Sequence, residues 1–474
     1  MSAFAGRVVV VGGGIAGLAA AFALSRELPE AQITVLEASG VIGGKLRVGK
    51  VAGVGVDVGA EALLARRPEG VALIRDVGLE AARMWPLTTA AQVRVGGGRF
   101  PLPAKTCQGI PSDVGATRES GALTEPALAR VAAEPSADPL PRLVDDIAVG
   151  ALVRSRLGNE VLDRLVEPLL GGVYAGRADE LSLRATMPAL ADHLEREGGS
   201  LVLAARAVNE LGARARSAGP VFTSLCGGLG TLPDEIVRRG RFLVRTSTTV
   251  RGVRRTPGGF AVECGTAADP DILSADAIVL ATPAAKTALL LRELAPAAAR
   301  ELGSVDTASV AIVTLAYRDV RPPPGSGLLV GAREGFGVKA VTLSSQKWPM
   351  ETGDMTILRA SLGRAGQAQI LQREDSDLVG LVRHELRSLI DVDAGPIDAI
   401  VTRWGGGLPQ YAVGHVEMVA RVRQAVADVP GLAVCGASYD GIGIPACIAS
   451  AQAAVARIVA STDRIGASMQ GRGE

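Results

Sequence analysis

Three glycines near the start of the chain have the spacing of a phosphate-binding turn. Gly12, Gly14 and Gly17 form the pattern G-x-G-x-x-G. The first glycine permits a tight turn, the second lets the backbone approach a pyrophosphate, and the third lets a helix pack closely on a strand. Glu37 follows Gly17 by 20 residues, where an acid that binds ribose hydroxyls is expected. The pattern therefore predicts a bound dinucleotide whose adenosine ribose has free hydroxyls, and it disfavours NADP.

The sequence on either side of this turn predicts the elements that would hold it in place. Residues 7–11 are typical of a buried parallel strand, residues 18–28 fit a helix, and residues 33–37 fit a second strand. The free N–H groups at the start of that helix would stabilise the charge of a diphosphate. The apolar run from Val8 to Leu24 also has features of a signal peptide or a short membrane span, but its consecutive glycines would weaken an inserted helix. We expect no other stretch to be long enough to cross a bilayer.

The composition excludes several classes of protein. The chain has 474 residues, which corresponds to two to four domains at about 100–200 residues per domain. Lys and Arg number 50 against 49 Asp and Glu, and this net charge of +1 argues against a protein that binds nucleic acid by neutralising phosphates. Five cysteines without C-x-x-C spacing and three scattered histidines indicate neither a disulfide framework nor a metal site. The expected compartment is the reducing cytoplasm.

A second pair of glycines lies behind the acid. Glu37-Ala38 is followed by Gly43-Gly44-Lys45, and this block resembles the E-A-x-x-x-x-G-G-[KR] signature of a large flavoprotein oxidase family. That family includes amine oxidases, phytoene desaturases and porphyrinogen oxidases. The resemblance implies that the dinucleotide is FAD rather than NAD, with the turn at Gly43 and Gly44 beside the pyrophosphate.

Further blocks are similar to the porphyrinogen oxidase branch and occur in the family's order. They are Val56–Glu61, Glu167–Gly176, Lys339–Pro349, Leu408–His415 and Val434–Pro445. The K-W-P block within the third of them resembles the coproporphyrinogen III oxidase type of bacteria that make haem through coproporphyrin. The resemblance implies an FAD-dependent enzyme of haem biosynthesis that oxidises coproporphyrinogen III to coproporphyrin III with O₂ and releases H₂O₂.

Other functions remain open on the sequence alone. A protoporphyrinogen IX oxidase is the nearest alternative, because the two substrates differ in propionates versus vinyl groups. An amine oxidase or a carotenoid desaturase is more distant, and an aromatic content of 3% does not favour the aromatic pair that would frame an amine. A non-catalytic binding protein that kept the fold is the alternative from another class, but flavin motifs at both ends of the chain argue against it.

The resemblance implies an α/β fold with a discontinuous Rossmann-like FAD-binding domain, an inserted α+β substrate domain and a helical cap. The expected FAD-binding domain comprises residues 1–75, 222–300 and 425–474. Residues 76–221 would form the helical cap, which in relatives makes peripheral membrane contact, and residues 301–424 would form the sheet that binds substrate. Residues 108–140 contain few large apolar side chains, so we expect a mobile surface excursion there.

The resemblance also implies which residues contact FAD. They are Gly12, Gly13, Gly14, Ile15, Ala16, Gly17, Glu37, Ala38, Gly43, Gly44, Lys45, Gly59, Ala60, Glu61, Ala62, Val250, Trp404, Gly436, Ile442, Gly443 and Ile444. Many FAD enzymes have Gly-Asp where this chain has Gly436-Ala437, so backbone N–H groups at the start of the last helix would replace that carboxylate. Trp404 is followed by three glycines, for which we expect a looser local turn.

The same resemblance implies a wide aliphatic pocket for a tetrapyrrole, with cations for its carboxylates. No catalytic side chain and no metal are expected, because the flavin carries the redox chemistry. The candidate substrate-binding residues are Arg66, Arg67, Gly172, Tyr174, Lys339 and Lys347. For each cation the alternative is a solvated surface charge, and for Gly172 and Tyr174 it is a helix C-cap and a core side chain.

Four further side chains have structural interpretations beside functional ones. Tyr411, like Trp404, is expected near the flavin, with a place in the core as the alternative. Cys435 and Cys447 are interpreted as small buried thiols rather than attachment points for flavin. His415 is expected to form a structural hydrogen bond rather than to act as a base.

Overall fold

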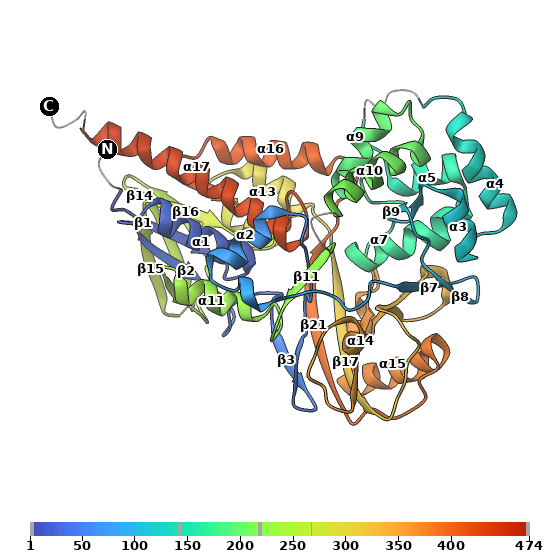
Figure 1. Cartoon of the computed structure of the whole chain (residues 1–474). Coiled ribbons are helices and arrows are strands. Elements are labelled where there is room, and N and C mark those ends of the chain that lie inside the picture. Colours follow the sequence, from blue (N-terminus) through green and yellow to red (C-terminus); the bar gives the residue numbers. More distant parts are fainter. Residues whose placement is uncertain (1–3, 141–144, 217–219, 267, 471–474) are drawn as a thin grey trace.

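The computed structural model describes residues 4–140, 145–216, 220–266 and 268–470. The sequence also predicts a helical pattern from Arg142 to Leu170, and the start of that pattern lies outside the described residues. Figure 1 shows three bodies of structure: a sheet with long helices along it, a cluster of short helices, and a second sheet below that cluster.

Strands that are far apart in the sequence form one five-stranded parallel sheet in the order β12-β2-β1-β16-β22. In sequence order they are β1 (Arg7–Val11), β2 (Gln32–Leu36), β12 (Leu243–Arg245), β16 (Ala277–Leu280) and β22 (Leu432–Val434). The four valines of β1 are all buried, because helices or strands cover both faces of the sheet. The first strand–helix–strand unit was predicted correctly. The sequence also predicts a strand over 244–250, but β12 ends at Arg245, and Ser247 has a φ of 51°, which a strand does not allow.

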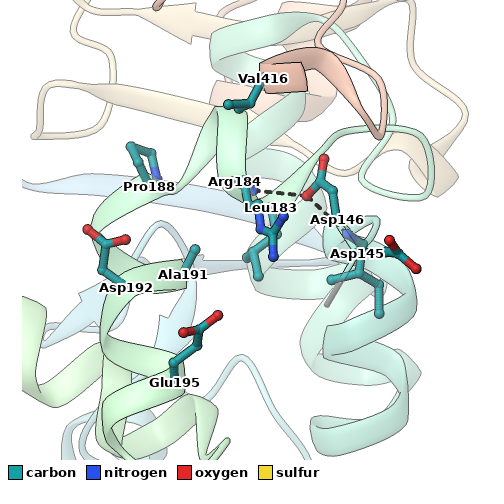
Figure 2. Close-up of a pocket in the computed structure, with 10 residues that line it drawn as sticks. Asp145, Asp146, Leu183, Arg184, Pro188, Ala191, Asp192, Glu195 and Val416 are labelled. Atoms are coloured by element: carbon teal, nitrogen blue, oxygen red, sulfur yellow. Dashed lines mark hydrogen bonds between the residues drawn. The ribbon is translucent and has the colours of Figure 1, made fainter. Parts of the chain in front are cut away.

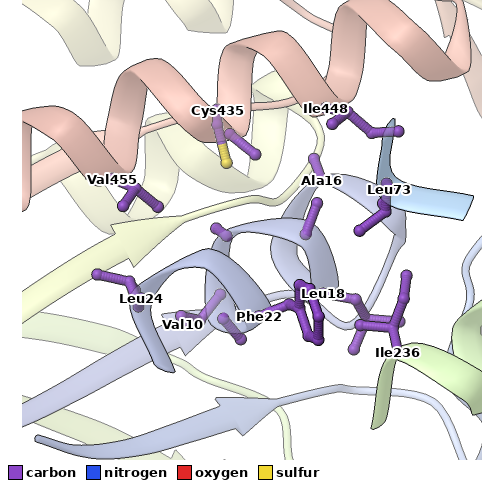
Figure 3. Packing of buried hydrophobic residues seen from close by; sticks show 14 of the residues in the cluster. Val10, Ala16, Leu18, Phe22, Leu24, Leu73, Ile236, Cys435, Ile448 and Val455 are labelled. Carbon is purple, nitrogen blue, oxygen red and sulfur yellow. The ribbon is translucent and has the colours of Figure 1, made fainter. Parts of the chain in front are cut away.

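Two helices pack on each other over one face of this sheet. They are α1 (Ile15–Glu27) and α17 (Ile444–Gln470), and α2 (Pro68–Asp76) and α11 (Thr231–Arg239) extend the same layer. Figure 3 shows Leu18 and Phe22 of α1 below Ile448 of α17, all within one buried cluster. A three-stranded antiparallel sheet and three further helices, α12 (Ala284–Leu291), α13 (Pro296–Gly303) and α16 (His415–Ala427), cover the opposite face.

The last helix corrects the expectation that no stretch other than Val8–Leu24 is long enough to cross a bilayer. Within α17, Ile444–Ser461 has the length and the mean hydropathy, 1.4, of a membrane-spanning helix. Half of this stretch is buried inside the protein, where Ala451 and Ile458 contribute to the core beneath it. Its apolar composition therefore matches a core helix that packs on α1.

A second, seven-stranded sheet has the order β21-β17-β20-β19-β18-β7-β8. Its strands are β7 (Ala91–Val95), β8 (Gly98–Pro101), β17 (Thr307–Arg318), β18 (Gly327–Val330), β19 (Val338–Thr342), β20 (Met355–Leu362) and β21 (Asp398–Pro409). The helix α15 (Asp375–Ile390) buries one of its faces. The expectation that all of 76–221 belongs to a helical cap is wrong for residues 91–101, because β7 pairs in parallel with β18.

Short helices form the third body and share one apolar cluster. They include α3 (Val114–Ser120), α4 (Glu125–Ala133), α5 (Val149–Leu157), α7 (Glu167–Tyr174), α8 (Leu183–Thr186), α9 (Pro188–Arg196) and α10 (Leu201–Arg216). The expected surface excursion over 108–140 is therefore wrong. Ile110, Leu128 and Val131 are buried, and alanines fill the remaining space in place of larger side chains.

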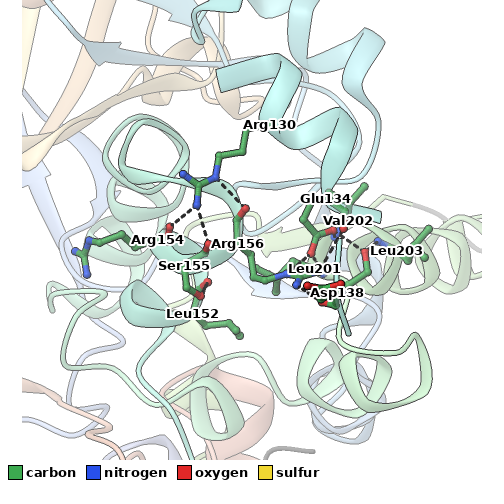
Figure 4. A network of polar contacts seen from close by, with 11 residues as sticks. Arg130, Glu134, Asp138, Leu152, Arg154, Ser155, Arg156, Leu201, Val202 and Leu203 are labelled. Atoms are coloured by element: carbon green, nitrogen blue, oxygen red, sulfur yellow. Dashed lines mark hydrogen bonds and ion pairs between the residues drawn. The ribbon is translucent and has the colours of Figure 1, made fainter. Parts of the chain in front are cut away.

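A buried carboxylate fixes this segment to its neighbours (Figure 4). The Glu134 side chain is fully buried and accepts hydrogen bonds from Arg156 Nε at 2.9 Å and from Ser200 Oγ at 2.6 Å. It also accepts the N–H groups of Leu201 at 2.9 Å and Val202 at 3.2 Å, which begin α10. One acid thus satisfies a buried cation and a helix N-terminus.

We predict that Glu134→Ala destabilises the protein strongly, because the Arg156 cation and the first N–H groups of α10 lose their acceptor. The expected loss is about 3–5 kcal/mol in the free energy of unfolding, the range for a broken buried ion pair. Urea denaturation measures it, with Glu119→Ala at an exposed position of α3 as the matched control. Equal unfolding midpoints for the two variants would contradict this account.

Candidate cofactor and substrate site

The turn between β1 and α1 combines close packing with one open position. Gly12 has a φ of 108°, and a Cβ on Gly17 would lie 1.9 Å from the carbonyl oxygen of Gly12, so both positions require glycine. A Cβ on Gly14 would have no atom within 4 Å. Gly14 is also the N-cap of α1, with no side-chain cap and no acid in the first turn. The backbone of Gly14, Ile15 and Ala16 is therefore available to a phosphate.

Glu37 lies beside this turn, at the end of β2. Its Oε2 accepts the N–H of Gly13 at 2.7 Å and its Oε1 accepts the N–H of Ser39 at 2.8 Å, so Ala38 lies in a tight turn. Each oxygen keeps a lone pair that a ribose hydroxyl could use. The N–H of Thr248 donates to the backbone carbonyl of Glu37 at 2.8 Å, which brings the segment before Val250 to this end of the sheet.

The second glycine pair closes over the same turn. The N–H of Gly43 donates to the carbonyl of Gly13 at 2.8 Å, and a Cβ on Gly44 would lie 3.2 Å from the Cα of Gly14. The expected neighbourhood of the pyrophosphate is thus assembled from residues 12–14 and 43–44.

Lys45 leads from the turn to the seven-stranded sheet. Its carbonyl accepts the N–H of Ala60 at 3.0 Å, and a Cβ on Gly59 would lie 2.0 Å from that carbonyl oxygen. Its Nζ donates to the carbonyl of Gly407 at 2.5 Å, and burial lowers the pKa of this amine. Trp404 Nε1 donates to the carbonyl of Val58 at 3.0 Å.

Trp404 lies within β21, next to a bulge in its pairing with β17. Gly405–Gly407 continue this strand, with a φ of 57° at Gly406, so the expected loose turn is a bulged strand instead. The bulge is part of the strand that carries both Trp404 and the carbonyl held by Lys45.

A buried cluster of charges joins the loop after β4 (Val54–Asp57) to the seven-stranded sheet. Glu61 accepts Lys347 Nζ at 2.5 Å and also pairs with Arg359 Nη1, while Arg359 Nη2 donates to the carbonyl of Gly59 at 2.6 Å. Burial alone would raise the pKa of Glu61, but the two cations outweigh it and lower that pKa to about 2. Asp57, which accepts the N–H groups of Leu229 and Gly230, has its pKa raised to about 6 by burial.

The N-terminus of α17 lies near Lys45, since Lys45 and Cys447 are close enough to affect each other's pKa. Gly436 follows β22 with a φ of 125°, and Ile442 and Gly443 lead into the helix at Ile444, which has no acid in its first turn. Cys435 and Cys447 are buried, and burial raises the pKa of Cys447 to about 11. Both thiols match the interpretation as inert core groups.

The candidate substrate residues do not form one cluster. Lys347 is neutralised by Glu61, and Arg67 pairs with Glu69 at 2.8 Å. Arg66 is exposed and has no hydrogen bond or ion pair within the described part of the chain. Lys339 is almost fully buried beside α7.

Gly172 and Tyr174 lie on α7. Tyr174 is buried, and the centroid of its ring lies 5.9 Å from that of Tyr411. Tyr411 is fully buried, donates to the carbonyl of Ala437 at 2.6 Å and stacks on His415 at 3.9 Å. His415 Nε2 hydrogen-bonds the carbonyl of Tyr439 at 3.0 Å, which fits the structural role expected for it.

Sequence reasoning missed Asp57, Arg359 and Arg364. Arg359 lies in β20 with 7% of its surface exposed, and its Nε has no partner within the described structure. The sequence predicts a strand over Thr356–Ser361 within the substrate domain. A charged residue inside that strand, Arg359, was the signal that could have identified the cluster, because buried charges are almost always paired.

None of the candidate cofactor-binding or substrate-binding residues lines a pocket of about 280 Å³ in the described structure (Figure 2). It is bounded by α8, α9 and the start of α16, and Asp145, Asp146, Asp192 and Glu195 line it together with Arg184. Its acidic lining does not suit a substrate that carries carboxylates. Within the described residues, no group of three or more His, Cys, Asp or Glu side chains is arranged to hold a metal ion.

The residues at the turn fit FAD. The open space at Gly14, the uncapped α1 and the free lone pairs of Glu37 suit a diphosphate next to a ribose. Hydrogen bonds from Lys45 to Gly407 and from Trp404 to Val58 form a path from this turn to Trp404. They bring the expected flavin residues into contact with the seven-stranded sheet.

We predict that Gly14→Ala and Gly17→Ala fail in different ways. The new methyl group at Gly14 meets no protein atom, so this variant should fold with nearly wild-type stability and lose FAD affinity by at least about 10-fold. The methyl group at Gly17 meets the Gly12 carbonyl, so that variant should be destabilised. Flavin absorbance after gel filtration and thermal unfolding of the apoprotein measure the two effects. Full FAD retention by Gly14→Ala would contradict the site.

We predict a pH-dependent contribution of Glu61 to stability. Since its pKa is lowered to about 2 by folding, its contribution is present above its ordinary pKa of 4.5 and is lost as the pH falls from there toward 2. The difference in unfolding free energy between wild type and Glu61→Gln should be about 3 kcal/mol at pH 7. It should shrink below pH 4.5, as measured by denaturant titration at several pH values. Exposed Glu293→Gln is the control, and a pH-independent difference for Glu61→Gln would argue against the ion-pair cluster.

Comparison with known proteins places these features in a family. The profile of the flavin-containing amine oxidoreductases matches residues 15–459. A Mycobacterium leprae protein named coproporphyrinogen III oxidase is 39% identical, with 96% of this chain and 98% of that protein covered. A Bacillus subtilis protein of the same name is 32% identical, with 94% and 97% covered.

A solved Exiguobacterium structure, described as a candidate protoporphyrinogen oxidase, superposes with a TM-score of 0.84 at 32% identity. The superposition covers 97% of this chain and 99% of the Exiguobacterium chain. The open phosphate turn, the path to Trp404 and these near-full-length similarities lead to one conclusion: the chain belongs to the flavin-containing amine oxidoreductases, a family of FAD enzymes.

Proposed function

We propose that the protein is an FAD-dependent coproporphyrinogen III oxidase. The observation that carries the proposal is its near-full-length similarity to proteins of that name, at 39% and 32% identity. The overall reaction oxidises coproporphyrinogen III with three O₂ to coproporphyrin III and three H₂O₂. This removes six electrons and six protons from the macrocycle. We propose that it serves haem biosynthesis in the cytoplasm.

The chain's own groups bind and orient the reactants. Bound FAD supplies the acceptor for a hydride in each two-electron step. The N-terminus of α1 and the Gly43–Gly44 turn bind its diphosphate, and Glu37 binds its ribose. Glu61, held by Lys347 and Arg359, fixes the Gly59–Ala62 segment against the second sheet.

In this proposal the three bodies of structure have separate roles. The five-stranded sheet and its helices bind FAD, the seven-stranded sheet faces the substrate, and the short helices cover the site and make peripheral membrane contact. Arg66 and Lys339 are the candidate cations without an acidic partner within the described part of the chain, so they are the better candidates for substrate carboxylates. Lys347 and Arg67 already hold acids of the protein.

A protoporphyrinogen IX oxidase is the second candidate function. The similarity to the Exiguobacterium structure favours it, since that protein is described by this activity. The two substrates differ in their carboxylates: coproporphyrinogen III carries four propionates, and protoporphyrinogen IX carries two propionates and two vinyl groups. Substrate preference therefore depends on how many buried cations face the macrocycle.

The direct test mixes the purified yellow protein with coproporphyrinogen III without oxygen. We predict that the flavin absorbance bleaches, and that porphyrin fluorescence and H₂O₂ accumulate after air is admitted. The same experiment with protoporphyrinogen IX is the comparison, with kcat/KM as the measure. Faster turnover of protoporphyrinogen IX would overturn the substrate assignment. Failure of both porphyrinogens to bleach the flavin, with a polyamine succeeding, would overturn the reaction.

A further inference from the structure

Lys339 occupies an irregular position in the seven-stranded sheet. In the pairing of β19 with β20, Val338 lies opposite Leu362 and Ala340 lies opposite Ser361, which leaves Lys339 as the extra residue of a bulge. Bulges commonly re-aim a side chain. Here the Lys339 side chain is directed toward α7, away from the core that packs on α15.

The buried Lys339 amine makes little use of its hydrogen-bonding capacity. The residue is 3% exposed, and its Nζ has one long contact, 3.4 Å to the carbonyl oxygen of Gly171. Charge-assisted hydrogen bonds are usually about 2.7–2.9 Å long, and an ammonium has three donors. No carboxylate lies within ion-pair distance of it in the described part of the chain. Burial lowers its pKa to about 7, as expected for an amine without a counter-ion.

A second cation, Arg364, lies beside Lys339. Its guanidinium donates to the carbonyls of Val330 at 3.2 Å and Phe336 at 3.5 Å, and burial lowers its pKa. The two nearby acids are already engaged with backbone N–H groups: Glu167 accepts from Ala178, and Glu385 accepts from Gly337 and Val338. The junction of α7 with the sheet thus holds one buried cation, Lys339, and one half-buried cation, Arg364, and no acid of the described residues is paired with either.

This junction is next to the proposed flavin path. The N–H of Ala365 donates to the carbonyl of Ala175 at 2.7 Å, just after the end of α7. Ala175 packs in one apolar cluster with Val310 and Trp404. A Cβ on Gly171 would meet nothing closer than the carbonyl oxygen of Gly176 at 3.9 Å, so there is space beside the helix.

We propose that Lys339 and Arg364 form a carboxylate subsite that selects the tetrapropionate porphyrinogen over the dipropionate one. The inference rests on the proposed function. A propionate placed here supplies the missing counter-ion, whereas a vinyl group at the same position leaves the buried Lys339 and the half-buried Arg364 unpaired and is disfavoured. Lys339 is therefore a specificity-determining residue.

A purely structural role for Lys339 makes a different prediction. Gly171 provides one of the last carbonyls of α7, and a cation there could stabilise the helix end. That role would make Lys339→Met destabilising and would affect both porphyrinogens equally. The carboxylate subsite instead predicts that Lys339→Met changes the ratio of kcat/KM for coproporphyrinogen III to kcat/KM for protoporphyrinogen IX.

The test compares Lys339→Met with Lys339→Arg, which retains the charge, and with Lys286→Met at an exposed position. We expect Lys339→Met to lower kcat/KM for coproporphyrinogen III by roughly 10- to 100-fold and to leave that for protoporphyrinogen IX unchanged or higher. Lys339→Arg should recover most of the loss. Gly171→Val, which fills the space beside α7, should weaken coproporphyrinogen III selectively without removing a charge.

A second readout separates this inference from the proposed function. Equilibrium binding of coproporphyrin III to the FAD-loaded protein, followed by porphyrin fluorescence, should weaken in Lys339→Met by a similar factor while flavin absorbance and thermal unfolding stay as in wild type. If Lys339→Met leaves both the ratio of the two kcat/KM values and the binding of coproporphyrin III unchanged, the subsite is overturned even if the enzyme is active. A wild-type protein that oxidises neither porphyrinogen would contradict the function, and the binding comparison would still decide on the subsite.

Discussion

The structure depends on a helix N-terminus that the protein itself leaves open. The first turn of α1 has no capping side chain and no acid, and no protein atom would touch a Cβ on Gly14. Unsatisfied N–H groups at a helix start are costly unless water or a ligand accepts them, and a diphosphate meets that need directly. The close contacts at Gly12 and Gly17 fix the strand and helix so that this open end points beyond the carboxyl end of β1.

The second constraint is the connection between the two sheets. Glu61 follows β4, whereas its partners Lys347 and Arg359 belong to the seven-stranded sheet region, up to 298 residues away in sequence. A buried carboxylate held by two cations is strongly destabilised when one partner is lost, so the relative position of the sheets is fixed by charge as well as by packing. Lys45 and Trp404 add hydrogen bonds across the same boundary. A flavin bound to one sheet and a substrate bound to the other would therefore be held in a fixed relative position.

Local pattern predicted the first strand–helix–strand unit and its acid, because each element there is specified by its own residues. The sequence could not reveal the partners of Lys347 or Glu134, since the interacting side chains are distant along the chain. Residues 108–140 were misjudged because a few large apolar side chains, such as Ile110 and Leu128, are enough to anchor the segment when alanines and one buried acid complete its contacts. Residues 91–101 joined the second sheet through a parallel pairing with β18 that no local pattern indicates.

A crystal structure of the purified protein with its flavin tests the central claim most directly. We predict density for FAD with its diphosphate within hydrogen-bond distance of the Gly14 and Ile15 N–H groups, its ribose on Glu37, and its ring near Trp404 on the side that faces the seven-stranded sheet. A structure with the diphosphate bound elsewhere, or with the ring directed away from that sheet, would contradict the account.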